Sequence, residues 1–152
     1  MLDRFEQFTA AISTIHRFVQ KIERDEMEKY GLKGASAQYL LAMARYPEGI
    51  TAAALCDVCD RDKAAVSRIL SEMEKKGLIA RANCGDNQYR APLELTAAGK
   101  EAADYVNQKA SRAAELAGQD LTDEDRLVLY AALDSIAANI ARLSRVGIPE
   151  QE

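Results

Sequence analysis

The stretch from Thr51 to Gly77 constrains the fold more than any other part of the sequence. Apolar residues recur there every three or four positions in two short runs, which predicts two short helices. Asp60 and Arg61 fall between the runs, and Asp62 has the side chain of a helix N-cap, so we expect a tight turn between the helices. The pattern indicates a helix-turn-helix, although an ordinary helical hairpin is an alternative that this window leaves open. The apolar positions are Ala52, Leu55, Val58 and Cys59 in the first helix and Val66, Ile69, Leu70 and Met73 in the second.

The second of these helices is predicted to turn small and basic residues away from its apolar side. At about 100° per residue, Arg68 and Lys75 lie opposite the apolar stripe. Arginine and lysine reach guanine or phosphate, while a small alanine lets the helix come close to a thymine methyl group. We therefore predict that this helix enters a DNA major groove. The candidate DNA-binding residues are Arg61, Lys63, Ala64, Ser67, Arg68, Ser71, Lys75, Arg81 and Arg90.

The periodicity changes after Gly77. Residues 78–82 and 89–95 are predicted to form two strands around the turn-rich segment 83–88. A hairpin that directly follows a recognition helix is a wing, whose tip reaches the DNA backbone or the adjacent minor groove. Arg81 and Arg90 are the only cations of this predicted wing, and Cys84 near its tip is expected to be exposed and open to oxidation.

Both ends of the chain are predicted to form long amphipathic helices. Apolar residues alternate at spacings of three and four over residues 2–29 and again from Leu129 to Leu143, where Thr122 opens the helix with a capping-box pattern. Shorter helices are expected at 36–45 and from Thr96 to about Ala117. Apolar residues at this spacing form a seam along one side of a helix, and two helices with such seams can pair with each other or with a second copy of the chain. The candidate dimer-interface residues are Phe5, Phe8, Ile12, Ile15, Leu133, Ile136, Ile140 and Leu143.

The charge of the chain is distributed unevenly. The net charge is −4, yet residues 61–90 hold seven Lys and Arg against four acids, whereas residues 96–152 hold six against ten. Because the field at a binding face follows the local charge, the middle of the chain can attract phosphate. No apolar run is long enough to span a bilayer, and the first eight residues carry charges where a signal peptide needs an apolar core. We expect a cytoplasmic protein with reduced cysteines.

The segments DKAAVSRILSEMEKKGLI, at 62–79, and YRAPLELTAAGK, at 89–100, resemble the corresponding segments of MarR-family transcriptional regulators. The resemblance covers nearly the whole chain. It implies a mainly α fold with a small β-hairpin wing, in which a winged helix-turn-helix is flanked by N- and C-terminal dimerisation helices. The domains expected are a dimerisation helix at 1–34, the DNA-binding module at 35–96 and C-terminal dimerisation helices at 97–152. It also implies a homodimer that binds a near-palindromic double-stranded DNA operator as a repressor and responds to a small molecule.

The chain departs from the family pattern at the turn and in the wing. Asp60 stands where the turn usually has glycine, and aspartate tolerates the left-handed backbone at a mild cost. Asn87 and Tyr89 stand where the wing often has Asp-x-Arg, which leaves the contact of the wing with DNA open.

A small aromatic or amphipathic effector is expected beside the helix at 36–45, next to the first helix and the start of the helix that follows Thr96. The alternative is that the residues in this region only pack against one another and bind no ligand. The candidate pocket residues are His16, Val19, Tyr39 and Met43.

Cys56 and Cys59 have the spacing of a redox or metal motif, but we interpret both as small apolar packing residues. Their place at a helix C-terminus beside acidic residues disfavours the thiolate, and four zinc ligands at motif spacing are lacking. No nucleophile–base pair or phosphate loop is visible, so we expect no enzyme, metal or cofactor. The remaining alternative is a winged-helix module for dimerisation or protein contacts without sequence-specific DNA binding, and the basic face of residues 63–75 favours the regulator.

Overall fold

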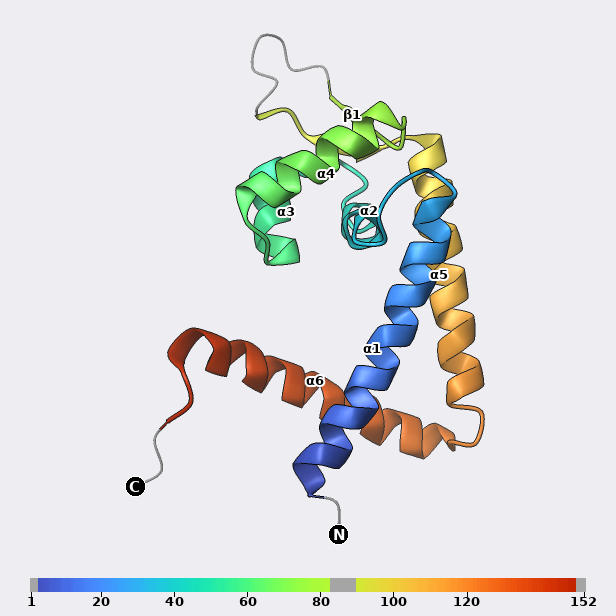
Figure 1. The fold of residues 1–152 in the computed structure, drawn as a ribbon, viewed down its shortest axis with the longest axis vertical. Coiled ribbons are helices and arrows are strands. Elements are labelled where there is room, and N and C mark those ends of the chain that lie inside the picture. The colour runs from blue at the N-terminus through green and yellow to red at the C-terminus, as the bar shows by residue number, and fades with distance from the viewer. Residues whose placement is uncertain (1–2, 83–89, 150–152) are drawn as a thin grey trace. The chain divides into compact units, whose positions relative to one another are not determined.

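The computed structural model describes residues 3–82 and 90–149, which form a mainly helical chain with one small hairpin (Figure 1). The expected fold class is confirmed by this architecture. In the described residues the elements are α1 (Arg4–Glu28), α2 (Ser36–Ala44), α3 (Ala52–Cys59), α4 (Lys63–Lys75), β1 (Ile79–Arg81), β2 (Leu93–Leu95), α5 (Ala97–Ala117) and α6 (Asp123–Val146).

Side-chain caps set where α3, α4 and α6 begin. Thr51 accepts a hydrogen bond from the backbone N–H of Ala54 at 3.2 Å, and Asp62 accepts one from Ala65 at 2.9 Å. At α6 the predicted capping box is present, with both reciprocal bonds between Thr122 and the residue three positions later. These caps confirm the predicted starts of α3, α4 and α6, because a cap satisfies backbone N–H groups that no helical turn can reach.

The hairpin is shorter than predicted. β1 and β2 pair antiparallel with Ile79 opposite Leu95, and the prediction that β1 begins at residue 78 and ends at 82 is wrong by one residue at each end. The described start of the second predicted strand, residues 90–92, is not strand, because Pro92 has no N–H to donate to a ladder. Leu93 also exchanges backbone hydrogen bonds with Ile50, which adds a short bridge on the other side of β2 that the sequence did not indicate. The turn and wing tip, with Cys84, Asn87 and Tyr89, lie outside the described residues.

One apolar core holds the winged helix-turn-helix together. It is built on the buried sides of α2, α3 and α4, and the hairpin, the last turns of α1 and the first half of α5 close it. Burial of apolar surface at roughly 25 cal/mol per Å² is the main force that stabilises such a core. Its largest fully buried side chains are Met27, Leu40, Met43, Leu55, Val66, Leu70, Met73, Leu78, Ile79, Leu93 and Val106.

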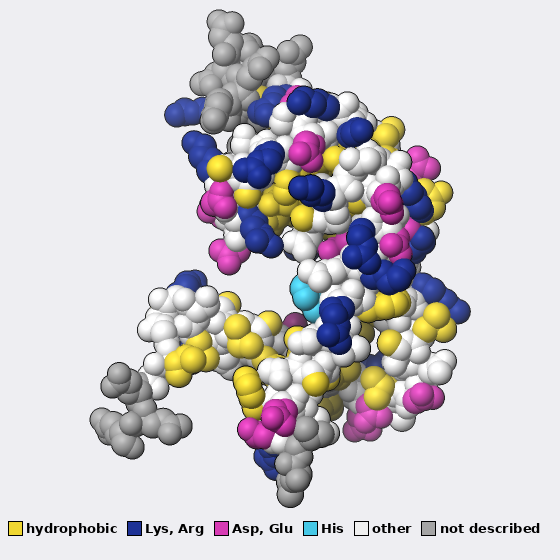
Figure 2. All heavy atoms as spheres, in the orientation of Figure 1, with side chains coloured by type: hydrophobic (Ala, Val, Ile, Leu, Met, Phe, Trp, Pro, Cys, Tyr) yellow, Lys and Arg dark blue, Asp and Glu magenta, His cyan; other side chains and the backbone are white. Residues whose placement is uncertain are grey.

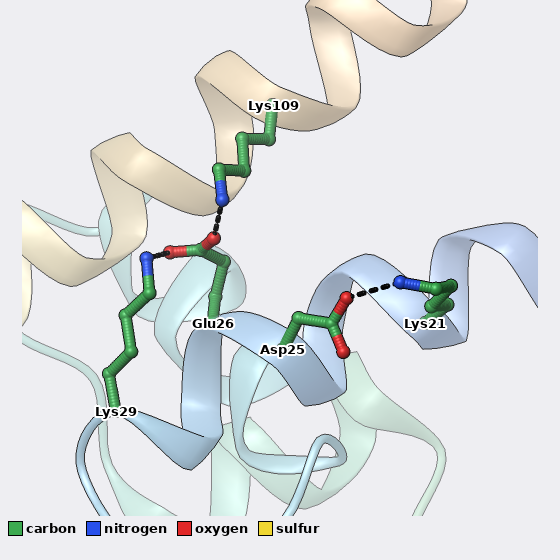
Figure 3. A network of polar contacts seen from close by, with 5 residues as sticks. All are labelled: Lys21, Asp25, Glu26, Lys29 and Lys109. Atoms are coloured by element: carbon green, nitrogen blue, oxygen red, sulfur yellow. Dashed lines mark hydrogen bonds and ion pairs between the residues drawn. The ribbon is translucent and has the colours of Figure 1, made fainter.

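A network of ion pairs ties the end of α1 to α5 (Figure 3). The carboxylate of Glu26 is almost fully buried and accepts from Lys29 at 2.7 Å and from Lys109 of α5. Three residues earlier, Glu23 is buried beside Gln38 of α2. The two carboxylates therefore attach the last turns of α1 to the neighbouring helices α5 and α2.

The chain divides into two compact units, Met1–Arg112 and Ala113–Glu152. This division is one of contacts, whereas the predicted division at residues 34 and 96 is one of function and stays a prediction. Within the first unit, α1 is buried only near its C-terminal end, and its earlier apolar residues are exposed. In the second unit, no residue of α6 is buried.

By length and composition alone, α6 is long and apolar enough to cross a membrane. The sequence led us to expect no such segment, because its apolar runs are short. A single helix of this kind is weak evidence for a span, and α6 carries Asp134 and Arg142 within its apolar stretch, where a bilayer would make charges costly. Its apolar residues also follow the spacing of a helix–helix seam.

Candidate nucleic-acid interface

A tight turn places α4 against α3. Asp60 ends α3 in the left-handed conformation, with φ +49° and ψ +53°, as expected for a residue standing where glycine is common. The N–H groups of Asp60 and Arg61 donate back to the carbonyls of Asp57 and Cys56 at 3.3 and 3.1 Å. Asp62 then caps α4. The predicted helix-turn-helix is thus confirmed in the backbone.

Three sides of α4 have different surroundings. Val66, Leu70 and Met73 are buried in the core, as the periodicity predicted. A second stripe, spaced four, three and four residues apart, is exposed along the whole helix, and it consists of Ala64, Arg68, Ser71 and Lys75. We call this stripe the outer face of α4. Small residues near its N-terminal end and in its middle leave the backbone accessible to a close partner.

The third side of α4 lines a hollow beside the wing. Lys63, Ser67 and Glu74 face it from α4, and a hollow of about 740 Å³ lies between them and the start of α3. Arg81 and Arg90 close it from the two sides of the hairpin. The remaining lining residues are Ala52, Ala53, Cys56, Asp57, Val66 and Leu70.

The structure therefore divides the predicted DNA-binding residues into two groups. Lys63, Ser67, Arg81 and Arg90 surround the hollow, whereas the outer face carries Ala64, Arg68, Ser71 and Lys75. Arg61 is exposed in the turn before α4. The helical spacing indicated the outer face, but the hollow brings together segments far apart in the sequence, and no local pattern could have shown it.

Arg81 is held by an acidic residue that sequence reasoning had not singled out. Its Nε lies 3.5 Å from Oε2 of Glu74, and both side chains are partly exposed. Exposed pairs of this kind contribute about 0–1 kcal/mol, so this pair adds little to the stability of the fold. Figure 2 shows Lys and Arg side chains spread over the module that contains α3 and α4, with acidic side chains among them.

Cys56 and Cys59 are free and partly buried against the core. Burial raises the pKa of the Cys59 thiol, in the direction that the sequence predicted, although the sequence argument had rested on the helix end and the neighbouring acids. A raised pKa keeps the thiol protonated and unreactive near neutral pH. Among residues 3–82 and 90–149, no group of three or more His, Cys, Asp and Glu is placed to hold a metal ion.

The four residues of the expected effector pocket divide between the core and the exposed surface of α1. Tyr39 and Met43 are 2% exposed and belong to the core, while His16 and Val19 are exposed on α1. A crevice of about 210 Å³ does lie close to the expected place, between the end of α2, the hairpin and the start of α5. Its lining residues are Met43, Ala44, Tyr46, Pro47, Glu94, Leu95, Lys100, Ala103 and Asp104, so it shares only Met43 with the expected set.

Comparison with known proteins agrees with this geometry. Residues 30–87, which run from the end of α1 through α4 into the wing, match a family model described as the MarR family. No curated protein sequence matches the chain.

Solved structures match over nearly the whole chain. A MarR transcriptional regulator from Methanosarcina mazei Go1 is 22% identical, with a TM-score of 0.76, over 91% of this chain and 99% of that one. A structure described as MarR is 26% identical, with a TM-score of 0.75, over 95% and 97%. A MarR-family regulator from Listeria monocytogenes, solved in complex with a 26mer DNA, is 22% identical with a TM-score of 0.75, over 95% and 97%.

Proposed function

We propose that the protein is a DNA-binding regulator. The winged-helix segment of this chain belongs to the MarR family, and the whole chain has the fold of MarR-family transcriptional regulators. The observation that carries the proposal is the outer face of α4. This face is exposed along its length and presents Arg68 and Lys75 with small residues between and before them. A major groove admits one α-helix, and these side chains reach base edges and phosphates from such a helix.

The hollow between α3, α4 and the wing supports the same proposal. Lys63, Arg81 and Arg90 line this hollow, and we propose that they meet the DNA backbone when the outer face of α4 is in the major groove. Contacts to phosphates position the protein and contacts to bases give it sequence preference. We assign the first role to the cations around the hollow and the second to Arg68, with Ala64 and Ser71 of the outer face at the bases and Ser67 beside the hollow.

We propose that the regulator acts as a homodimer through α1 and α6. The apolar side chains of both helices are exposed in the single chain, with Phe5 69% and Ile15 61% exposed in α1. Large apolar surfaces left in water mark an interface, and a second copy of the chain covers them without a further partner. The proposed interface residues are Phe5, Phe8, Ile12, Ile15, Leu133, Ile136, Ile140 and Leu143. Covering the apolar side of α6 in this way agrees with a cytoplasmic protein.

A two-fold dimer presents two copies of α4, so the operator is proposed to be a near-palindrome with half-sites about one helical turn apart. We propose that the protein is a repressor, which blocks transcription by occupying such an operator. Fusing the operator to a reporter gene tests the sign of regulation: a repressor lowers expression when it is co-produced, and an activator raises it.

We also propose that a small aromatic or amphipathic molecule releases the protein from DNA. The crevice at the end of α2 supports this, because it is walled by Met43, Tyr46, Pro47 and Leu95 with a few charged groups around them. A tenfold loss of operator affinity needs about 1.4 kcal/mol of coupling. Phenolic and carboxylate compounds titrated into the operator complex test the proposal, with Met43→Ala, Tyr39→Ala and His16→Ala showing which residues the effector needs.

The experiment that tests the proposed function is selection of bound duplexes from a random DNA library, followed by sequencing. The regulator is expected to enrich an inverted repeat with half-site centres about 10 base pairs apart. The other candidate, a winged-helix module for dimerisation or protein contacts, predicts no enriched sequence. An enriched single half-site without a repeat would keep the DNA-binding function and remove the two-fold arrangement.

A further inference from the structure

The corner between β2 and α5 is hydrogen-bonded to the turn that ends α4. The hydroxyl of Thr96 donates a hydrogen bond to the carbonyl oxygen of Gly77 at 2.7 Å and accepts one from the N–H of Gly99 at 3.1 Å. The backbone N–H of Thr96 donates to the carbonyl of Leu78 at 3.0 Å. One residue thus joins the turn that ends α4 to the first turn of α5, across 19 positions of sequence.

The turn to which Thr96 is hydrogen-bonded is itself joined to α4 by backbone hydrogen bonds. Gly77 adopts φ +71°, its N–H donates to Glu74, and the N–H of Leu78 donates to Met73, which is the bonding pattern of a Schellman motif. Leu78 and Met73 are also buried in the core. A displacement of this turn therefore moves the C-terminal end of α4 with it.

Gly99 sets how closely α5 approaches the same turn. A Cβ atom built on Gly99 would lie 1.9 Å from the carbonyl oxygen of Leu78 and 3.0 Å from its carbonyl carbon. Both atoms belong to the backbone, which cannot rotate out of the way as a side chain does. Any larger residue at this position must push α5 and the end of α4 apart.

A helix cap alone does not require this arrangement, as α6 shows. Thr122 also caps a helix, but its side chain bonds only with Asp125 of its own helix. At Thr96, capping accounts for the bond with Gly99, whereas the bond to Gly77 links two elements. The second bond points to a role beyond helix stability.

We propose that Thr96 and Gly99 are positioning residues that fix the recognition helix for reading DNA, an inference that rests on the proposed function. The N-terminal end of α4 is set by the turn from α3, and the corner at Thr96 sets its C-terminal end. With 13 residues, α4 is about 20 Å long, so a shift on the order of 1 Å at this end tilts the whole outer face. Hydrogen bonds to base edges weaken steeply with such a shift, while contacts to phosphates tolerate it better.

The test compares operator preference among matched threonine variants. Thr96→Val keeps the shape of the side chain and removes both hydroxyl bonds, Thr96→Ser keeps the hydroxyl, and Thr122→Val removes a cap of the same kind from α6. Affinity is measured for the selected operator and for a scrambled duplex of equal length, alongside urea unfolding and sedimentation. We expect Thr96→Val to lower the ratio of operator affinity to scrambled-duplex affinity about tenfold. Thr96→Ser should keep the ratio of the wild type. Thr122→Val should leave this ratio unchanged although it loses stability.

The outcomes separate the inference from the function beneath it. If Thr96→Val loses stability as Thr122→Val does, and its operator preference stays that of the wild type, Thr96 is only a cap and the inference is wrong. If the wild type itself prefers no sequence, the proposed function fails, and the inference falls with it. Gly99→Ala is expected to lower the ratio further. Should that variant not fold, the threonine series still decides.

Discussion

At the scale of single residues, Asp60 has a strained backbone conformation in the turn before α4. It adopts the left-handed conformation that glycine occupies without strain and that other residues occupy at a cost. Among the described non-glycine residues, Asp60 is the one with a positive φ. The strain lies in the connection that orients the recognition helix.

We expect Asp60→Gly to leave the protein between unchanged and about 1 kcal/mol more stable, because relief of strain exceeds the extra entropy of the unfolded chain. Operator affinity should stay within about twofold of the wild type, since the residue ends α3 and its backbone path is kept. Thermal unfolding and DNA titration measure the two effects. Destabilisation by more than about 1 kcal/mol would show that the Asp60 carboxylate makes a stabilising interaction.

Two buried carboxylates near the end of α1 have opposite shifts. Hydrogen bonds from Lys109 and Lys29 lower the pKa of Glu26. Burial raises the pKa of Glu23, although the hydrogen bond with Gln38 opposes the shift. The ion pairs of Glu26 therefore stabilise the folded chain when the carboxylate is charged, whereas the charged form of Glu23 is a cost to it.

Glu26→Gln should consequently lower the free energy of unfolding at pH 7 by about 1–3 kcal/mol, the range for hydrogen bonds to a charged group. Because the folded pKa of Glu26 is lowered, its stabilisation is present above the unfolded pKa, near 4.5, and is lost as the pH falls through the folded value. The deficit of the variant should therefore shrink below pH 4.5. Urea unfolding from about pH 3 to pH 7 measures it.

Glu23→Gln is the matched control on the same helix. At pH 7 it should be neutral or slightly stabilising, because it removes a charge that burial disfavours. If Glu23→Gln and Glu26→Gln destabilise the chain equally, the assignment of opposite roles to these two carboxylates is wrong.

At the scale of the elements, the sequence predicted α4 well because the information is local. The cap at Asp62, the buried Val66, Leu70 and Met73 and the exposed Arg68 all follow from spacing within a few residues. The same holds for the capping box of α6. The starts of α1 and α5 were likewise predicted within about two residues.

Features that join distant segments could not be predicted. Glu26 meets Lys109 across 83 positions, and the bridge between Ile50 and Leu93 joins the start of the helix-turn-helix to the second strand. Capping and periodicity concern neighbours in the chain, whereas these interactions depend on how the elements pack. For the same reason the residues expected at the effector pocket proved to divide between the core, at Tyr39, and the exposed surface of α1, at His16.

At the scale of the whole molecule, the exposed apolar sides of α1 and α6 lead us to expect an obligate homodimer. Ile140 is 53% exposed in the single chain and Ile15 is 61% exposed. Ile15→Asp or Ile140→Asp would bury an unpaired charge in an apolar interface at a cost of several kcal/mol, on the order of that for burying an unpaired polar group. The matched control is Ile148→Asp, at an exposed position beyond α6.

Sedimentation at micromolar concentration measures the effect. The wild type and Ile148→Asp should be dimers, while the two seam variants should dissociate or lose their fold. A monomeric wild type would remove the homodimer from the proposal, and dimers that persist in both seam variants would place the interface elsewhere.

The most direct measurement of the central claim, that the outer face of α4 reads DNA, is operator affinity as a function of salt for the wild type, Arg68→Ala and Lys75→Ala. Arg68→Ala should cost about 1–3 kcal/mol of operator affinity for each half-site and little affinity for scrambled DNA, because Arg68 is assigned to base edges. Lys75→Ala, at the end of α4 nearer the DNA backbone, should weaken binding to both duplexes and reduce the salt slope by about two units, because each protomer of the dimer then neutralises one phosphate fewer. Equal operator affinity for Arg68→Ala and the wild type at every salt concentration would contradict the claim.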